Sequence, residues 1–299
     1  MTQSEIVAIV AREVAKHLVV SIRPRTLADA IADLLRVKAA ARRRPAYIRS
    51  LRQYLAMFAR GREQLPVSSL TVGDLDDWFN SRNEAPCTQA SNVGRLSALF
   101  QFGVRRGWLD QNPCRRLEPV AVEYKAPKIL TPEEALKLME AVRASCPRGL
   151  AWFALALFAG IRPEECDRLT WSNIDLTAGV VRIDAAAAKL RQRRIVHLMP
   201  AAIAWLQAAK ETGADLPIPN VTRRRMQRDL RPTMGWEAWP QDILRHTAAS
   251  YWLAAVQDAG KVAHELGNSA GILLRHYREL VSREDAERFW AMRPMPAEA

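Results

Sequence analysis

In the first part of the chain, apolar residues recur every three or four positions, the spacing of one face of an α-helix. Two of the expected helices begin with motifs that resemble a capping box, Thr26-x-x-Asp29 and Thr71-x-x-Asp74. Three successive stretches have the apolar positions Leu27, Ile31, Leu34 and Leu35; Tyr47, Ile48, Leu51, Leu55 and Phe58; and Leu75, Trp78 and Phe79. A fourth helix is expected from about Thr88 to Arg106. We expect a four-helix unit over residues 22–118.

The segments on either side of this unit have weaker patterns. Residues 1–21 carry apolar positions at helical spacing between Glu5 and Val20, which fits either an amphipathic helix or an N-terminal arm. Asn112-Pro113 stops the last helix of the unit, and most of residues 119–130 show neither helical nor alternating spacing. We therefore interpret residues 119–130 as a linker between domains.

Beyond the linker the pattern predicts both helices and strands. Thr131-Pro132-Glu133-Glu134 combines an N-cap, a proline at the first helical position and a glutamate that completes a capping box. Leu150 to Phe158 is apolar nearly all round, which is typical of a helix buried in a domain centre. From Val180 to Leu198 the period is two, which predicts two strands of a small antiparallel ribbon. Helices return from Pro240 onward, the last of them opened by Ser282-x-x-Asp285.

These patterns predict a mainly α-helical protein with a small antiparallel β ribbon. The 299 residues are enough for two domains that each bury a core. The first domain would be the four-helix unit, and the second would cover residues 131–299.

Composition indicates the partner. A formal net charge of +12 and a pI near 10.1 favour a polyanion, and nucleic acid fits better than a membrane. The most apolar stretch, Leu150 to Gly160, is too short to span a bilayer, and the first residues form no signal peptide, so we expect a soluble cytoplasmic protein. The four cysteines form no Cys-x-x-Cys pair and the five histidines have no metal-ligand spacing. We expect neither a disulfide framework nor a metal or other cofactor.

Arginines that are candidates for DNA contact lie in three places. One group precedes the second helix of the first domain, one lies in the loop of the ribbon, and one lies on a basic helical segment, Thr222 to Arg228. For this last group, a solvated helix face is an equally good interpretation. The candidates are Arg42, Arg43, Arg44, Arg191, Arg193, Arg223, Arg224, Arg225 and Arg228.

Three features of the second domain indicate phosphodiester chemistry. They are Gly160-Ile161-Arg162-Pro163-Glu164-Glu165, then Leu244-Arg245-His246-Thr247, then Tyr277 near the C-terminus. A guanidinium stays protonated and binds two phosphate oxygens at once, so Arg162 and Arg245 could together clamp one phosphate. Taken alone, each arginine more often forms an ordinary ion pair, such as Arg162 with Glu165, and a lone tyrosine more often packs in a core. The order of the three features favours the catalytic interpretation.

Lys189 lies between the two arginine motifs, in the expected turn of the ribbon. A lysine there could protonate a leaving 5′ oxygen, because it gives up its proton closer to neutral pH than Arg191 would. A non-specific contact with the DNA backbone is the alternative. Tyr277 would attack phosphorus to give a phosphotyrosyl link. Because the leaving hydroxyl can attack that link in reverse, cutting and rejoining would need neither ATP nor metal.

In these motifs, the second half of the chain resembles the catalytic domain of tyrosine recombinases, the phage integrase family. The four-helix half is similar to their SAM-like core-binding domain. The likeness spans roughly residues 22–292 and also includes Leu169-Thr170-Trp171-Ser172-Asn173-Ile174-Asp175 and Leu266-Gly267-Asn268-Ser269. It implies a site-specific DNA recombinase or integrase of a bacterial-type cytoplasm, shaped as a clamp around duplex DNA, with four protomers acting on two sites.

The resemblance also implies a role for each matching residue. Arg162, Arg245 and Asn268 would bind the scissile phosphate, Lys189 would be the general acid, Glu165 the supporting acid and Tyr277 the nucleophile. The chain departs from the family at two of the usual histidine positions, where it has Asp242 and Asn268. An amide can still donate a hydrogen bond to phosphate, whereas a carboxylate repels it. Asp242 would therefore either turn away to brace Arg245 or belong to a divergent site.

His246 follows Arg245 directly, but neighbouring helix residues point in different directions, which disfavours His246 as a replacement for the missing histidine. Asp242 also keeps a second function open, that of a DNA-binding protein on a recombinase scaffold that no longer cleaves. A type IB topoisomerase would share the phosphotyrosine chemistry, and the short first half disfavours it. The final helix has an apolar face, including Phe289 and Trp290, that would either close its own domain or dock on a neighbouring protomer.

Overall fold

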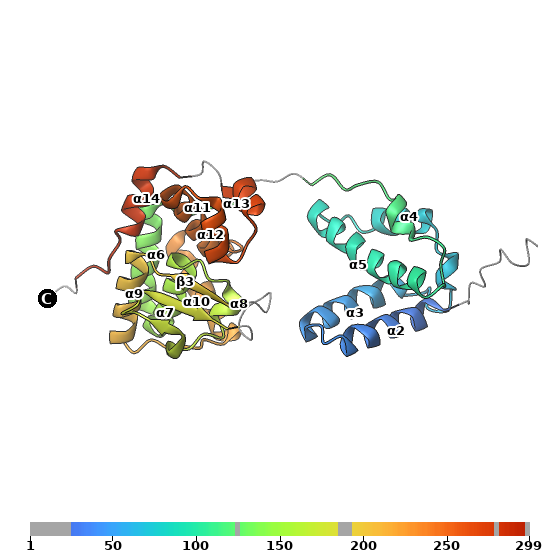
Figure 1. Ribbon diagram of the computed structural model, residues 1–299, viewed down its shortest axis with the longest axis horizontal. Coiled ribbons are helices and arrows are strands. Elements are labelled where there is room, and N and C mark those ends of the chain that lie inside the picture. Colours follow the sequence, from blue (N-terminus) through green and yellow to red (C-terminus); the bar gives the residue numbers. More distant parts are fainter. Residues whose placement is uncertain (1–24, 123–125, 185–192, 278–280, 297–299) are drawn as a thin grey trace, which may run out of the picture. The chain divides into compact units, whose positions relative to one another are not determined.

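The computed structural model describes residues 25–122, 126–184, 193–277 and 281–296 (Figure 1). The chain divides into two units, Met1–Glu123 and Tyr124–Ala299, called unit 1 and unit 2 below. The predicted helix or arm over residues 1–21 lies outside the described residues, and so do Lys189 and Arg191.

Unit 1 is built from four α-helices in the part of it that the structure describes. They are α2 (Leu27–Ala40), α3 (Pro45–Ala59), α4 (Val72–Asn80) and α5 (Pro86–Arg105). The expected caps are confirmed, because the Thr26 hydroxyl accepts the N–H of Asp29 at 3.2 Å and the Thr71 hydroxyl accepts that of Asp74 at 3.3 Å. Helix α5 begins two residues earlier than expected, because Pro86 takes the first helical position, where its missing N–H costs nothing.

Aromatic rings fill the centre of unit 1. Phe58 lies edge to face against Trp78, with ring centroids 5.1 Å apart, and contacts Phe100 at 6.4 Å. Phe58 and Phe100 are fully buried. Unit 1 therefore has its own hydrophobic core.

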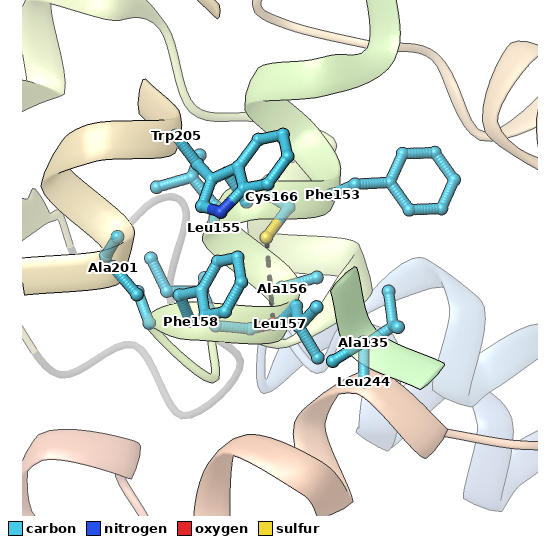
Figure 2. Close-up of a cluster of buried hydrophobic side chains, with 14 of the residues drawn as sticks. Ala135, Phe153, Leu155, Ala156, Leu157, Phe158, Cys166, Ala201, Trp205 and Leu244 are labelled. Carbon is cyan, nitrogen blue, oxygen red and sulfur yellow. Dashed lines mark hydrogen bonds between the residues drawn. The ribbon is translucent and has the colours of Figure 1, made fainter. Parts of the chain in front are cut away.

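In unit 2 a fully buried helix lies at the centre. All nine residues of α7 (Leu150–Phe158) are buried, and α6 (Pro132–Ser145), α9 (Pro200–Glu211) and α11 (Ile243–Val256) pack around it. Figure 2 shows part of this core, where Phe158 stacks on Trp205 at 6.4 Å and the thiol of Cys166 donates a hydrogen bond to the carbonyl of Ile161 at 3.6 Å. The prediction of a buried central helix is confirmed.

The β ribbon has one strand more than the sequence predicts. Strands β2 (Val180–Ile183) and β3 (Arg194–His197) pair antiparallel, with Val181 opposite Val196. The two-residue strand β1 (Ile174–Asp175) extends the sheet in the order β1-β2-β3. Its two residues are too few to show an alternating pattern, so the sequence analysis missed this strand.

The remaining helices of unit 2 are short. They are α8 (Pro163–Cys166), α10 (Asn220–Leu230), α12 (Ala259–Leu266), α13 (Ala270–Tyr277) and α14 (Arg283–Trp290). Helices α11 to α14, orange to red in Figure 1, gather at one end of unit 2. The Ser282 hydroxyl caps α14 by accepting the N–H of Asp285 at 3.0 Å, as predicted. The apolar residues Phe289 and Trp290 are buried in the core of unit 2.

Candidate active site

The first arginine of the site is placed by a tight turn after α7. Gly160 has a left-handed φ of +57°, and a Cβ on it would come within 2.5 Å of the Leu266 side chain and 3.2 Å of Ala248. Only glycine fits such a close approach in that backbone conformation. The chain then turns into the short helix α8, with Arg162 as its N-cap residue. The turn thus brings Arg162 against the end of α12.

The guanidinium of Arg162 contacts the segment that follows α12. Its Nη2 donates to the carbonyl of Gly267 at 2.6 Å and to the Asn268 side-chain oxygen at 2.7 Å, and its Nη1 donates to the carbonyl of Leu266 at 3.2 Å. Gly267 has a φ of +61°, and a Cβ there would lie 3.3 Å from Arg162 Nη1. The predicted pair Arg162 and Asn268 is therefore brought together in space.

Arg245 lies beside Arg162 and is more deeply buried, with 7% of its surface exposed. It donates through Nη1 to the carbonyl of Gly160 and through Nη2 to that of Leu266 at 2.7 Å. The carbonyl of Leu266 is thus shared by both arginines. Burial, helped by the neighbouring charge of Arg162, lowers the pKa of Arg245 to about 9. Two adjacent cations held by neutral carbonyls form a place where an anion is favoured.

Glu165 is fully buried, and its shortest described contact is with Arg194 of β3, a residue that the sequence analysis did not include in the site. Arg194, 8% exposed, donates to both carboxylate oxygens of Glu165, at 2.6 and 3.3 Å, while Arg162 lies 3.6 Å from the same carboxylate. Arg194 also donates to the carbonyl of Glu265 at 3.1 Å. Its signal was the alternation of β3, because Arg194 shares a strand face with the buried Val196.

Tyr277 is the last residue of α13 and is 6% exposed. Its hydroxyl lies 2.7 Å from Nδ1 of His246, and the two rings are 5.6 Å apart and tilted by 41°. His246 and Arg245 do point in different directions, as expected, but α13 lies in the direction of His246. Sequence analysis could not place α13, so it did not foresee the contact between His246 and Tyr277; whether His246 replaces the missing histidine stays a prediction.

The pKa of Tyr277 is raised above its ordinary value, mainly because burial disfavours the phenolate. The negative charge of Asp242 raises it further, whereas the charges of Arg245 and Arg162 lower it. The net effect of these groups is a tyrosine that keeps its proton at neutral pH.

Asp242 lies at the start of α11 in a left-handed conformation, with φ of 50° and ψ of 19°, and its side chain is exposed. It lines a cavity of about 590 Å³ together with Arg162 and Arg245. Among the described contacts, no ion pair joins the Asp242 carboxylate to Arg245, so the brace considered from the sequence is not formed. Its backbone carbonyl accepts the N–H of His246 at 2.8 Å.

The candidate DNA contacts divide into exposed and buried arginines. Arg42, Arg43, Arg193, Arg224, Arg225 and Arg228 are exposed, and Arg44 is half-buried at the start of α3. Arg223 differs from its neighbours on α10. It is 9% exposed, donates to both oxygens of Asp167 at 2.9 and 3.2 Å, and lies 5.4 Å from the centre of the Trp152 ring. The assignment of Arg223 to a DNA-contacting face is corrected, because its guanidinium is engaged inside unit 2.

The described residues were also searched for metal-ligand clusters and membrane-spanning helices. The described residues contain no cluster of three or more His, Cys, Asp or Glu side chains suited to a metal ion. Within the same ranges, none of the helices combines the length and hydropathy that crossing a membrane requires.

Comparison with known proteins agrees with the resemblance seen in the motifs. Residues 128–283, more than half of the chain, match the model of the phage integrase family. The tyrosine recombinase XerC of Chlamydia muridarum (strain MoPn / Nigg) is 25% identical over 236 residues, which cover 71% of this chain and 74% of XerC.

Two solved structures have a similar fold. A lambda integrase(75-356) dimer bound to a COC′ core site matches with a TM-score of 0.68, covering 86% of this chain and 98% of that one. A lambda integrase tetramer bound to a Holliday junction matches with a TM-score of 0.65, covering 86% and 80%. Both are 16% identical to this chain, so the similarity supports the fold alone.

Proposed function

Because this chain belongs to the phage integrase family of tyrosine-type site-specific recombinases, we propose that it cleaves and rejoins DNA strands through a covalent link to Tyr277. Family membership supports site-specific recombination and does not favour a DNA-binding protein that has lost cleavage. The observation that carries the assignment of residues is that two guanidiniums, the half-buried Arg162 and the buried Arg245, share the carbonyl of Leu266.

The two arginines would bind the scissile phosphate. Charge on the non-bridging oxygens grows toward the pentavalent transition state, and fixed donors stabilise it without reorganising. The carbonyl contacts of Arg162 and Arg245 hold both guanidiniums in place, and the remaining N–H groups of each guanidinium would donate to the phosphate. The amide nitrogen of Asn268 would add a donor, because its oxygen already accepts from Arg162. Glu165 would act through Arg162 as the supporting acid.

Tyr277 would attack phosphorus in line with the leaving 5′ oxygen and form a 3′-phosphotyrosyl link. Lys189, in the segment between β2 and β3, would protonate the leaving oxygen. The link conserves the energy of the phosphodiester, so a 5′ hydroxyl of the partner strand would reverse the step without ATP. The reaction needs no metal in this scheme, because the arginines supply the positive charge.

The two units would have different functions. Residues 22–118 would be the core-binding domain, residues 119–130 the linker and residues 131–299 the catalytic domain, preceded by an arm over residues 1–21. The division between Glu123 and Tyr124 and the separate core of unit 1 support this organisation. The exposed arginines Arg42 and Arg43 of unit 1 and Arg224, Arg225 and Arg228 of α10 would contact the DNA backbone.

The partner would be duplex DNA in a bacterial-type cytoplasm, bound by a homo-oligomer. Lambda integrase, whose fold is similar, is described as a dimer on a core site and as a tetramer on a Holliday junction. Two sites brought together by four protomers would give the corresponding synapse here. The net charge of +12 supports a polyanionic partner.

A suicide substrate tests the proposed function. Duplexes that the protein retains from a random pool define its site, and a nick placed beside the scissile phosphate lets the short 5′ fragment diffuse away after cleavage. The unmutated chain should accumulate a covalent adduct, whereas Tyr277→Phe, which loses one oxygen, should bind the same DNA and form none. An adduct with the Phe variant would show that another residue is the nucleophile. Binding without any adduct from the unmutated chain would instead favour the non-cleaving alternative.

A further inference from the structure

The contact between His246 and Tyr277 suggests how the nucleophile is activated. His246 lies on α11 and Tyr277 ends α13, and the two helices lie at the same end of unit 2 (Figure 1). The hydroxyl oxygen of Tyr277 is 2.7 Å from Nδ1 of His246, which is the distance of a good hydrogen bond. That oxygen is the atom that would attack phosphorus.

The position of His246 is fixed by the backbone of α11. Its N–H donates to the carbonyl of Asp242 at 2.8 Å, and its own carbonyl accepts the hydroxyl of Ser250 at 3.0 Å. Consecutive helix residues point about 100° apart. Arg245 is directed at the carbonyls of Gly160 and Leu266, so His246 is directed at α13. One helix therefore serves both the phosphate and the nucleophile.

A base is needed here, because the buried phenol holds its proton. Burial raises the pKa of Tyr277, and the carboxylate of Asp242 adds to this, while Arg245 and Arg162 act in the opposite direction. Tyr277 also lines a groove of about 470 Å³, and among the described residues that form this groove the tyrosine is the only ionisable one; the others are Ser250, Leu253, Ala254, Gln257, Leu274 and Val281. Among the described contacts, His246 is the titratable side chain that touches the hydroxyl.

Histidine suits this role, because it can take up and give back a proton near neutral pH. Asp242, at the position where the family usually has histidine, lines the cavity of the two arginines, and no described hydrogen bond joins it to Tyr277. The imidazole that contacts the tyrosine hydroxyl thus belongs to His246. This residue lies four positions after Asp242, which is about one turn of α11.

We propose that His246 is the general base for Tyr277, an inference that rests on the proposed function. In cleavage, the hydroxyl proton of Tyr277 passes to Nδ1 of His246 as the bond from tyrosine oxygen to phosphorus forms. The bond from phosphorus to the 5′ oxygen breaks, and the proposed general acid Lys189 gives that oxygen its proton. In rejoining, a 5′ hydroxyl gives its proton to Lys189 and attacks phosphorus. The bond from phosphorus to the tyrosine oxygen breaks, and the protonated His246 returns its proton to that oxygen. No oxidant, nucleotide or metal enters the balance.

The test is single-turnover cleavage of a suicide substrate with sulfur in place of the bridging 5′ oxygen. A thiolate leaves without a proton, so the pH dependence reports the activation of Tyr277 rather than the general acid. His246→Asn keeps a polar group near the Nδ1 position but cannot act as a base, and His246→Ala removes both functions. His264→Ala, at an exposed histidine on α12, is the matched control, and gel-shift affinity and thermal melting check binding and folding.

We expect both His246 variants to cleave about 10²–10⁴-fold more slowly than the unmutated chain, with DNA affinity unchanged. The unmutated rate should rise with pH between about 5 and 8 and then level off, and this rise should vanish in His246→Asn. Added imidazole should restore part of the rate of His246→Ala, which keeps the test decisive if the Asn variant folds poorly. Cleavage by His246→Asn at the unmutated rate, with the same pH rise, would overturn the assignment and leave the proposed function intact. No adduct from the unmutated chain would overturn both.

Discussion

The two units hold their arginines in different ways. In unit 1, Arg25, Arg62, Arg82, Arg95 and Arg106 lie over aromatic rings, 4.8–5.8 Å from the ring centroids. Two of them also pair with carboxylates at partly exposed positions, Arg25 with Asp33 and Arg82 with Glu84, each at 2.6 Å. In unit 2, Arg162 and Arg245 are largely buried and donate mainly to backbone carbonyls. Among the described residues, the two arginines with less than a tenth of their surface exposed, Arg223 and Arg245, both lie in unit 2.

Burial alone does not identify the functional arginines. Arg223 is as buried as Arg245, but both oxygens of Asp167 neutralise it. Arg162, Arg194 and Arg245 have one buried carboxylate near them, that of Glu165. Burying a charge without a full partner is costly, so an excess of buried cations indicates a site that an anionic substrate completes. The comparison makes partner type, rather than depth, the useful criterion.

Removing the guanidinium of Arg162 or Arg245 should have the largest effect on function. We expect Arg245→Ala and Arg162→Ala each to lower the rate of adduct formation by at least about 10²–10³-fold, because each removes a preorganised donor from the phosphate. Arg245→Lys should lose most of that rate too, since lysine lacks the planar fork. The measurement is single-turnover cleavage of the nicked substrate. Arg182→Ala, at an exposed arginine 3.4 Å from Asp175, should cleave normally, and rates within tenfold for all the variants would refute the distinction between the sites.

The next largest effect should be on the stability of unit 2. Arg194→Met removes the 2.6 Å ion pair of the buried Glu165 carboxylate, so we expect the free energy of unfolding to fall by about 3–5 kcal/mol. Urea denaturation followed by tryptophan fluorescence measures it. Adding Glu165→Gln should recover part of the loss, because the buried negative charge that Arg194 neutralised is then gone. A loss below about 1 kcal/mol would mean that the Arg194 and Glu165 pair behaves like a surface pair.

A smaller effect separates two buried tyrosines, one in each unit. The Tyr251 hydroxyl donates to the carbonyl of Leu130 at 3.0 Å, whereas that of Tyr54 has no hydrogen-bond partner in the described structure. Tyr251→Phe should lower the free energy of unfolding by about 1 kcal/mol or somewhat more. Tyr54→Phe should leave it unchanged or raise it slightly, because it removes an unpaired buried hydroxyl. Urea melts of the two variants side by side decide this, and equal losses would contradict it.

The smallest effect is expected at an exposed pair of unit 1. Arg36 contacts Asp33 at 2.5 Å, but 77% of the Arg36 side chain is exposed. Arg36→Met should change the free energy of unfolding by about 0–1 kcal/mol, because water screens such a pair and ordering the side chain offsets the attraction. A loss as large as that of Arg194→Met would remove the contrast between the units.

Much of the fold could be predicted from local patterns. Thr26, Thr71, Thr131 and Ser282 cap the helices that their motifs predicted, because a cap depends on residues three positions apart. The wholly apolar stretch of α7 is the buried helix, because no other environment suits it. Strand β1 was missed, since two residues carry no period.

The site could be predicted only in part. The motifs identified Arg162, Arg245, Glu165, Asn268 and Tyr277 as candidates, and the structure joins the first four in one network. They gave no sign that Arg194 would pair with Glu165, 29 positions away, or that Arg223 would pair with Asp167, 56 positions away. Both arginines lie in basic stretches, and such stretches predict solvent-exposed side chains.

The sequence by itself determined the helices, the ribbon and the motifs of the family, because caps, periodicity and glycine turns act between neighbours along the chain. Only the tertiary structure decided which side chains share a partner. The hydroxyl of Tyr277 meets His246 across 31 positions, and Arg162 meets Gly267 across 105. Those meetings depend on how α11, α12 and α13 pack around one core, and packing is a property of the whole unit rather than of any one segment.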